Sequence, residues 1–252
     1  LPADEVREQA EMNFWPHGRT TGDMSKETGL QVVNKGTGVW VEDVDGERWF
    51  DTLSALWLVN IGHGRTEIAE AVYEQMKAIS FTPHDTVSPV TASLSARLAD
   101  LNGDPNTRTY FVSSGSEANE AALKIAKNYH YVSGDKLRNK VISRRGSYHG
   151  STLACTSLGR GGLTGESVPT AFGQLMPGNV HVAQPDSYRG HGSAAGSGSG
   201  AVWADELEQA ILHEGPETVA AFIGEPISCG AGVHLPPSDY WPRVREICDR
   251  YG

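Results

Sequence analysis

One stretch decides the fold class of this chain, Phe111-Val112-Ser113-Ser114-Gly115-Ser116-Glu117-Ala118-Asn119-Glu120. It joins a predicted buried strand, 109–112, to a predicted helix, 116–131, whose apolar side chains share one face. The Ser/Gly turn between them leaves the helix start with free N–H groups and the positive end of the helix dipole. Such a junction suits a phosphate, and Gly115 lets the backbone approach a ligand closely. The segment 114–117 is also a capping box, S-x-x-E, which requires no ligand.

Strands and helices alternate over the rest of the second half of the chain. Val141-Ile142 and 219–223 are short apolar runs typical of buried strands, and helices are predicted near 203–213 and 239–251. Strands that alternate with helices indicate parallel βαβ units. We therefore predict an α/β fold with a mostly parallel, doubly wound sheet flanked by helices.

The first part of the chain has a different pattern. Asp45-Gly46 separates the strand-like runs 39–44 and 47–51, which predicts a hairpin. Helices are predicted at 4–13, 66–79 and 91–102. An N-terminal α+β segment thus precedes the α/β part.

Composition excludes several function classes. The 21 basic and 31 acidic residues give a net charge of −10, which argues against nucleic-acid and anionic-membrane binding. The 3 cysteines have no metal-binding spacing, and no apolar run is long enough to span a membrane. We expect no metal, no membrane, and reduced thiols in the cytoplasm.

The stretch around Ser116 resembles the phosphate-binding segment of class III (omega) aminotransferases, which are pyridoxal-phosphate enzymes of fold type I. Other segments resemble further landmarks of this family, in the same order along the chain: Leu56 to Gly64, Gly146 to Thr152, Gly224 to Ile227 and Pro236 to Trp241. The resemblance covers nearly the whole chain. It favours the phosphate interpretation over the capping box alone.

The resemblance implies cofactor-binding roles in the second half. Gly115 and Ser116 correspond to residues that bind the cofactor phosphate, helped by Ser114. Tyr148 corresponds to the aromatic residue that stacks on the pyridine ring; a core tyrosine is the alternative.

Two neighbours of these residues have less specific roles. Glu225 ends a strand, where it can bond the cofactor hydroxyl or a mobile arginine, or form a structural ion pair. His149 is expected to pack or to hydrogen-bond behind the cofactor, not to transfer a proton.

Three aromatic residues are expected on the substrate side of the pocket. Trp57 corresponds to a pocket residue, although a tryptophan in an apolar run more often packs in a core. Phe14 and Trp15 resemble a segment that lines the neighbouring subunit's pocket; simple hydrophobic anchoring is the alternative.

The resemblance also implies a domain division. Residues 1–64 correspond to an N-terminal segment that belongs to the small domain and the pocket loop. Residues 65–252 correspond to the first part of the cofactor-binding large domain. The Schiff-base lysine and the aspartate that pairs with the pyridine nitrogen are expected beyond Gly252, with the rest of both domains, so no catalytic residue is expected within the chain.

The implied activity is transfer of an amino group from a primary amine or omega-amino acid to a keto acid such as pyruvate. The pocket loop resembles the amine:pyruvate or taurine:pyruvate branch. A homodimer or larger assembly with shared active sites is implied. The alternatives are an aminomutase or decarboxylase of the same fold, or a catalytically incompetent fragment that keeps only a phosphate-binding cradle.

Overall fold

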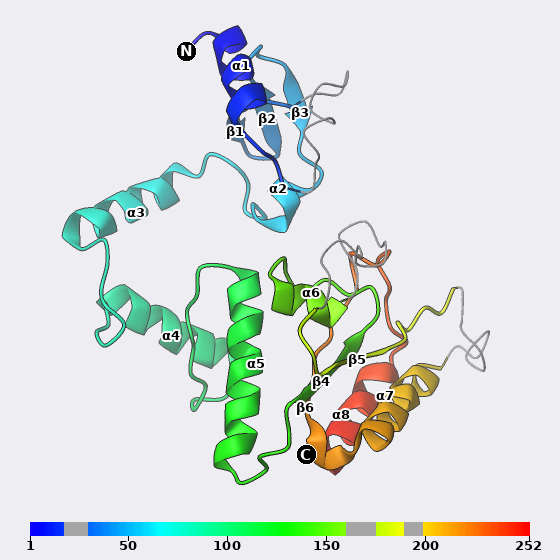
Figure 1. Cartoon of the computed structure of the whole chain (residues 1–252). Helices are drawn as coiled ribbons and strands as arrows, with labels where there is room; N and C mark the ends of the chain where they lie inside the picture. Colours follow the sequence, from blue (N-terminus) through cyan, green and yellow to red (C-terminus); the bar gives the residue numbers. More distant parts are fainter. Residues whose placement is uncertain (18–29, 160–174, 189–198) are drawn as a thin grey trace. The chain divides into compact units, whose positions relative to one another are not determined.

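A computed structural model describes residues 1–17, 30–159, 175–188 and 199–252. The chain forms two compact units, Leu1–Thr107 and Arg108–Gly252 (Figure 1). This division falls later along the chain than residue 64, where we predicted the end of the N-terminal segment. The assignment of residues 1–64 to a small domain stays a prediction.

In its described residues, the first unit combines helices with a 3-stranded antiparallel sheet in the order β1-β2-β3. Its elements are α1 (Ala3–Asn13), β1 (Val33–Thr37), β2 (Trp40–Asp43), β3 (Arg48–Phe50), α2 (Ser54–Trp57), α3 (Thr66–Ala78) and α4 (Pro89–Asn102). The hairpin predicted around Asp45-Gly46 is confirmed, because β2 and β3 pair antiparallel with Trp40 opposite Phe50. β1 was not predicted.

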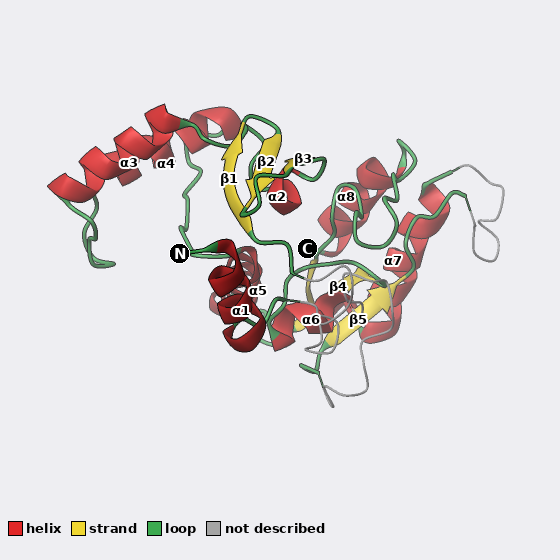
Figure 2. Ribbon diagram, turned by 90° about the horizontal axis from the view of Figure 1, so that it is seen from above, coloured by secondary structure: helices red, strands yellow, loops and turns green. Residues whose placement is uncertain are grey.

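The second unit is a parallel sheet between two layers of helices (Figures 1 and 2). Its elements are α5 (Gly115–Val132), β4 (Lys140–Arg144), α6 (Leu153–Gly159), β5 (Asn179–Val182), α7 (Ala201–Glu214), a 3-10 turn η4 (Pro216–Thr218), β6 (Val219–Phe222) and α8 (Tyr240–Tyr251). The central strand β4 pairs in parallel with β5 on one side and with β6 on the other. The predicted α/β architecture is confirmed.

Adjacent residues of β4 show how both faces of this sheet are covered. Val141 and Ile142 are both 0% exposed, and successive side chains of a strand point to opposite faces. Val141 packs with Leu123 of α5 and Leu158 of α6. Ile142 belongs to the larger cluster that includes Leu207 of α7 and Ile247 of α8, among others. The sheet therefore has the two covered faces that parallel sheets require.

The predicted strand 109–112 is wrong. These residues form no strand in the structure, and Tyr110 is 72% exposed. A strand is stable only when a neighbouring strand takes up its backbone hydrogen bonds. Within the described residues no strand pairs with this segment. The turn and helix that follow it, which carry the candidate site, are formed as predicted.

Candidate functional site

The site lies where the three parallel strands of the described residues end. β4 leads into the loop with Tyr148 and His149, β5 leads to Gln184, and β6 leads to Glu225. The carboxyl ends of parallel strands lie at the same edge of a sheet, which is where α/β proteins bind their ligands. The N-terminus of α5 meets the loop of β4 at this edge, since Ser151 N–H donates to Ser116 Oγ over 3.0 Å.

The start of α5 has the predicted cap and open donors. Ser114 has extended backbone angles and its hydroxyl accepts from Glu117 N–H at 3.2 Å, while the Glu117 carboxylate accepts from Ser113 N–H at 2.8 Å. Within the described residues the N–H groups of Gly115 and Ser116 have no acceptor. A side chain at Gly115 would meet nothing within 4 Å. The helix therefore presents two unused donors to open space, as an anion requires.

The loop after β4 packs tightly on this helix start. Asn119 Nδ2 donates to the carbonyl of His149 at 2.7 Å, and Cys155 Sγ lies 3.3 Å from the carbonyl of Ser116. Gly150 has φ +132°, and a Cβ there would lie 2.4 Å from Ser116 Oγ. The loop can therefore reach the Ser116 hydroxyl only because residue 150 is glycine.

Tyr148 and Glu225 are also brought together. The backbone N–H of Tyr148 donates to Glu225 Oε1 at 3.0 Å, and the Tyr148 hydroxyl lies 3.0 Å from Ser151 Oγ. The Tyr148 side chain is 38% exposed, so its ring is accessible to a ligand. Ser116, Tyr148 and Glu225 thus form one connected group through Ser151.

His149 points away from solvent. It is 6% exposed, and its Nε2 has no partner among the described residues. Burial lowers the pKa of His149 below its ordinary value of 6.5, with Arg144 acting in the same direction and Glu225 opposing. The imidazole is therefore neutral near pH 7, which fits the expected packing role.

A buried arginine that the sequence did not suggest lies behind Glu225. Arg144, the last residue of β4, is 0% exposed and donates to the backbone carbonyl of Glu225. Its guanidinium lies 5.3 Å from the ring centroid of Trp241 and 5.8 Å from that of Tyr240. The aromatic faces compensate part of the cost of burying this charge, and burial lowers its pKa.

The sequence analysis did not identify several other residues that contact Ser116, Tyr148 or Glu225 or lie next to them. Ser151 and Asn119 lie inside segments already quoted, so their closeness to Ser116 and Tyr148 was a usable signal. Gln184 and Ser228 belong to no quoted motif. Their one signal is that each follows a strand of the parallel sheet, at its carboxyl end.

The three predicted pocket aromatics, Trp57, Phe14 and Trp15, belong to the first unit and are exposed. Ser116 and Tyr148 belong to the second unit, and the pocket role of the three aromatic residues stays a prediction. Trp57 lies on an unusual element. Residues 54–57, which are not glycine, all have positive φ, between 47° and 70°, so α2 is a left-handed turn.

Asp51 holds this turn in place. Its carboxylate accepts from the N–H groups of Leu53 at 3.2 Å and Ala55 at 2.8 Å, and lies 2.8 Å from His63 Nε2. The hydrogen bond with His63 lowers the pKa of Asp51 below 3.8; the two backbone N–H groups add to this and burial opposes it.

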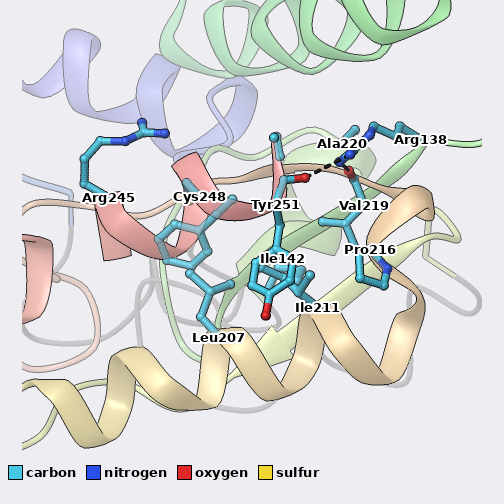
Figure 3. Close-up of a pocket in the computed structure, with 13 residues that line it drawn as sticks. Arg138, Ile142, Leu207, Ile211, Pro216, Val219, Ala220, Arg245, Cys248 and Tyr251 are labelled. Atoms are coloured by element: carbon cyan, nitrogen blue, oxygen red, sulfur yellow. Dashed lines mark hydrogen bonds between the residues drawn. The ribbon is translucent and has the colours of Figure 1, made fainter. Parts of the chain in front are cut away.

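A different hollow lies at the amino ends of the strands. Figure 3 shows this pocket of about 270 Å³ between the sheet, α7 and α8. Arg138 there donates to the carbonyls of Val219 at 2.9 Å and Tyr251 at 2.8 Å. Its lining is mainly apolar and its arginine is bonded to backbone, so we read it as a packing gap.

The described ranges contain neither a candidate metal site nor a candidate membrane span. Among these residues no group of three or more His, Cys, Asp or Glu side chains is placed to hold a metal ion. None of the described helices combines the length and apolar character that crossing a bilayer demands.

Comparisons with known proteins agree on one family. The sequence model of class III aminotransferases matches residues 21–252. A putrescine–pyruvate aminotransferase of Pseudomonas aeruginosa is 38% identical over 228 residues, which cover 89% of this chain and 49% of that protein. A taurine–pyruvate aminotransferase of Bilophila wadsworthia is 34% identical over 227 residues, covering 87% and 47%. The chain spans about half the length of the curated relatives it matches.

Solved structures give the same result. An (S)-enantioselective omega-transaminase from Thermomicrobium roseum superposes with a TM-score of 0.89 at 38% identity, over 100% of this chain and 55% of that one. An amine transaminase from an uncultivated Pseudomonas species, described as PLP-bound, gives a TM-score of 0.84 at 33% identity, over 95% and 54%.

Proposed function

Because the chain belongs to the class III aminotransferase family, we propose that its protein transfers an amino group from a primary amine or omega-amino acid to a keto acid such as pyruvate. The cofactor is pyridoxal phosphate, which supplies the electron sink for this chemistry. The named relatives use pyruvate with putrescine or taurine. The family resemblance of the pocket loop supports the same substrate class here.

The start of α5 fits the phosphate of this cofactor. The free N–H groups of Gly115 and Ser116, with the positive helix end, would hold the anion. The oxygen of the Ser116 hydroxyl already accepts from Ser151 N–H, so its proton is available for donation to a phosphate oxygen. Ser114 supports these residues by capping the helix.

Tyr148 and Glu225 fit the cofactor ring. The accessible ring of Tyr148 would stack on the pyridine ring and fix its plane. Both Glu225 oxygens accept from protein donors, Tyr148 N–H and Ser228 O–H, which suits an ionised carboxylate. Its remaining lone pairs would accept the cofactor hydroxyl or a mobile arginine.

The observation that carries this proposal is the convergence of Ser116, Tyr148 and Glu225 at the carboxyl edge of the sheet. The test is an assay on the protein made from its complete natural reading frame. With pyridoxal phosphate, pyruvate and putrescine, taurine or β-alanine, alanine should form with one keto or aldehyde product per alanine. Release of carbon dioxide, or movement of the amino group within one molecule, would identify the decarboxylase or aminomutase alternative instead.

We further propose that the Schiff-base lysine and the aspartate for the pyridine nitrogen follow Gly252 in the complete protein. Borohydride reduction with pyridoxal phosphate, followed by peptide mapping, tests this. A stoichiometric adduct on one lysine within residues 1–252 would overturn the proposal.

We also propose a homodimer or larger assembly in the cytoplasm, with Phe14 and Trp15 lining the neighbouring subunit's pocket. The free thiols of Cys155, Cys229 and Cys248 support a reducing compartment. The many exposed apolar side chains of the first unit support burial against other protein. Sedimentation of the complete protein and fractionation of its source cells are the tests.

A further inference from the structure

Gln184 connects the loops that follow β4, β5 and β6, the parallel strands among the described residues. Its side-chain Nε2 lies 3.0 Å from Ser147 Oγ in the loop after β4, and 2.8 Å from Ser228 Oγ in the loop after β6. Gln184 itself follows β5. Ser147 immediately precedes Tyr148, and Ser228 is bonded to Glu225. One amide therefore connects the segments that carry the two proposed ring-contacting residues.

The direction of these hydrogen bonds follows from the carboxylate. Ser228 Oγ lies 2.6 Å from Glu225 Oε2, and an ionised carboxylate only accepts. The single hydroxyl proton of Ser228 is thus committed to Glu225, and its oxygen is left to accept. Gln184 must therefore present its NH₂ group to Ser228, which fixes the amide orientation.

Burial makes this arrangement rigid. Ser147 and Ser228 are almost fully buried and Gln184 is 9% exposed, so water competes weakly for their bonds. The Gln184 Oε1 atom has no partner among the described residues. A buried unpaired carbonyl costs free energy. An apolar side chain of similar size would avoid this cost, but the position holds a glutamine.

From these contacts we propose that Gln184 is a positioning residue, which acts through Ser228 and Ser147 to hold Glu225 and Tyr148 in the geometry that binds the cofactor ring. The inference rests on the proposed function, because it assumes that Glu225 and Tyr148 face pyridoxal phosphate. It assigns no contact between Gln184 and the cofactor.

The test compares Gln184→Met, Ser228→Ala and the double variant in the complete protein. Methionine keeps the length of the side chain but removes both donors. The readouts are the dissociation constant of pyridoxal phosphate and the visible circular dichroism of the bound cofactor, which reports how its ring is held. Ser143→Ala is the control, since it removes a buried serine hydroxyl of β4 that bonds to Leu158 and not to the site. Apoprotein melting curves check that each variant is folded.

Each single variant should weaken cofactor binding about three- to tenfold and change the circular dichroism band. The double variant should lose less affinity than the sum of the two single losses, because both changes remove the bond that Gln184 shares with Ser228. Ser143→Ala should change stability only. If Gln184→Met does not fold, Ser228→Ala alone must show the loss and the altered band.

An unchanged band and affinity in Gln184→Met and Ser228→Ala, or additive losses in the double variant, would overturn the inference. Ser116→Ala, measured in the same series, separates this failure from that of the proposed function. If Ser116→Ala weakens binding and the Gln184 series does not, only the role of Gln184 is wrong. If Ser116→Ala has no effect either, the proposed cofactor site and the inference are both wrong.

Discussion

At the scale of single residues, the site depends on close contacts between small side chains. Gly150 is the clearest example. Its left-handed φ of +132° disfavours any other residue, and a Cβ would lie 3.0 Å from Ser116 Cα as well as 2.4 Å from its hydroxyl oxygen. The contact that holds Ser151 N–H on Ser116 requires this closeness.

Gly150→Ala should therefore disturb the phosphate seat and not only the local backbone. We expect cofactor affinity to fall about tenfold or more, because overpacking of this kind costs roughly 1–3 kcal/mol. Gly134→Ala is the matched control: residue 134 also has positive φ, +101°, but an added Cβ there meets nothing within 4 Å. Both variants should lose stability, and only the first should lose affinity. Equal affinity in both would show that Gly150 has no role at the site.

Tyr148 should act through its ring. Its hydroxyl bonds to exposed Ser151, where water can replace it, so Tyr148→Phe should bind pyridoxal phosphate nearly as the wild type does. Tyr148→Ala should bind much more weakly, because stacking requires the ring. Cofactor titrations of the three proteins decide this. Should phenylalanine be as damaging as alanine, the hydroxyl is the important group.

Some residues of the candidate site could be predicted from the sequence and others could not. Ser114, Gly115 and Ser116 were predictable because a helix cap combines residue type with position. Tyr148 and Glu225 rested on resemblance. Gln184 and Ser228 were not predictable, since their roles come from loops that meet only once the strands have paired.

At the scale of elements, the left-handed turn α2 has a high local conformational cost. An L-residue in this conformation loses roughly 1–2 kcal/mol, and residues 54–57 adopt it together. The bonds from Leu53 and Ala55 to Asp51 oppose this cost. Strained backbone conformations that the rest of the structure stabilises are often found at functional sites. The strain at residues 54–57 is consistent with the pocket role predicted for Trp57.

Asp51→Asn should weaken this turn in a pH-dependent way. The pKa of Asp51 lies below 3.8 in the folded protein, so its contribution is complete above about pH 4 and is lost as the pH falls through the folded value. The stability gap between wild type and variant should therefore be widest at neutral pH and close in acid. Ala55→Gly, added to Asp51→Asn, should restore about 1 kcal/mol of the free energy of unfolding, because glycine tolerates positive φ. Denaturation at several pH values measures both free energies of unfolding. A difference between wild type and Asp51→Asn that widens in acid would show that the Asp51 carboxylate does not stabilise the turn.

Elements differed in how well sequence predicted them. The hairpin at Asp45-Gly46 and the helix after Ser114 have local chemistry that specifies them, and both formed. The strand 109–112 had the right composition but no partner among the described strands. Nothing in Ser54-Ala55-Leu56-Trp57 indicates positive φ, because no glycine or asparagine is present. The carboxylate that accepts hydrogen bonds from Leu53 and Ala55 belongs to Asp51, outside the turn.

At the scale of the whole molecule, the two units differ in burial. The second unit has well-covered clusters on both faces of its sheet. In the described part of the first unit no side chain is fully buried. The apolar face of α3 is open, with Ile68, Val72, Met76 and Ile79 between 41% and 60% exposed.

Residues 1–252 produced alone should therefore self-associate. Open apolar surface of this extent favours aggregation or pairing. We expect strong binding of a hydrophobic dye and a sedimentation profile broader than that of a monomer, compared with the complete protein as reference. A monodisperse, dye-free monomer would contradict this prediction.

The central claim is that the start of α5 holds the phosphate of the cofactor. The most direct measurement compares pyridoxal phosphate with pyridoxal, which lacks the phosphate, on wild-type protein and Ser116→Ala. Loss of a hydrogen bond to a charged group costs about 1.5–3 kcal/mol, so pyridoxal phosphate should bind the variant about ten- to a hundredfold more weakly. Pyridoxal should bind both proteins equally. If both ligands lose affinity to the same extent, or neither does, Ser116 does not hold the phosphate.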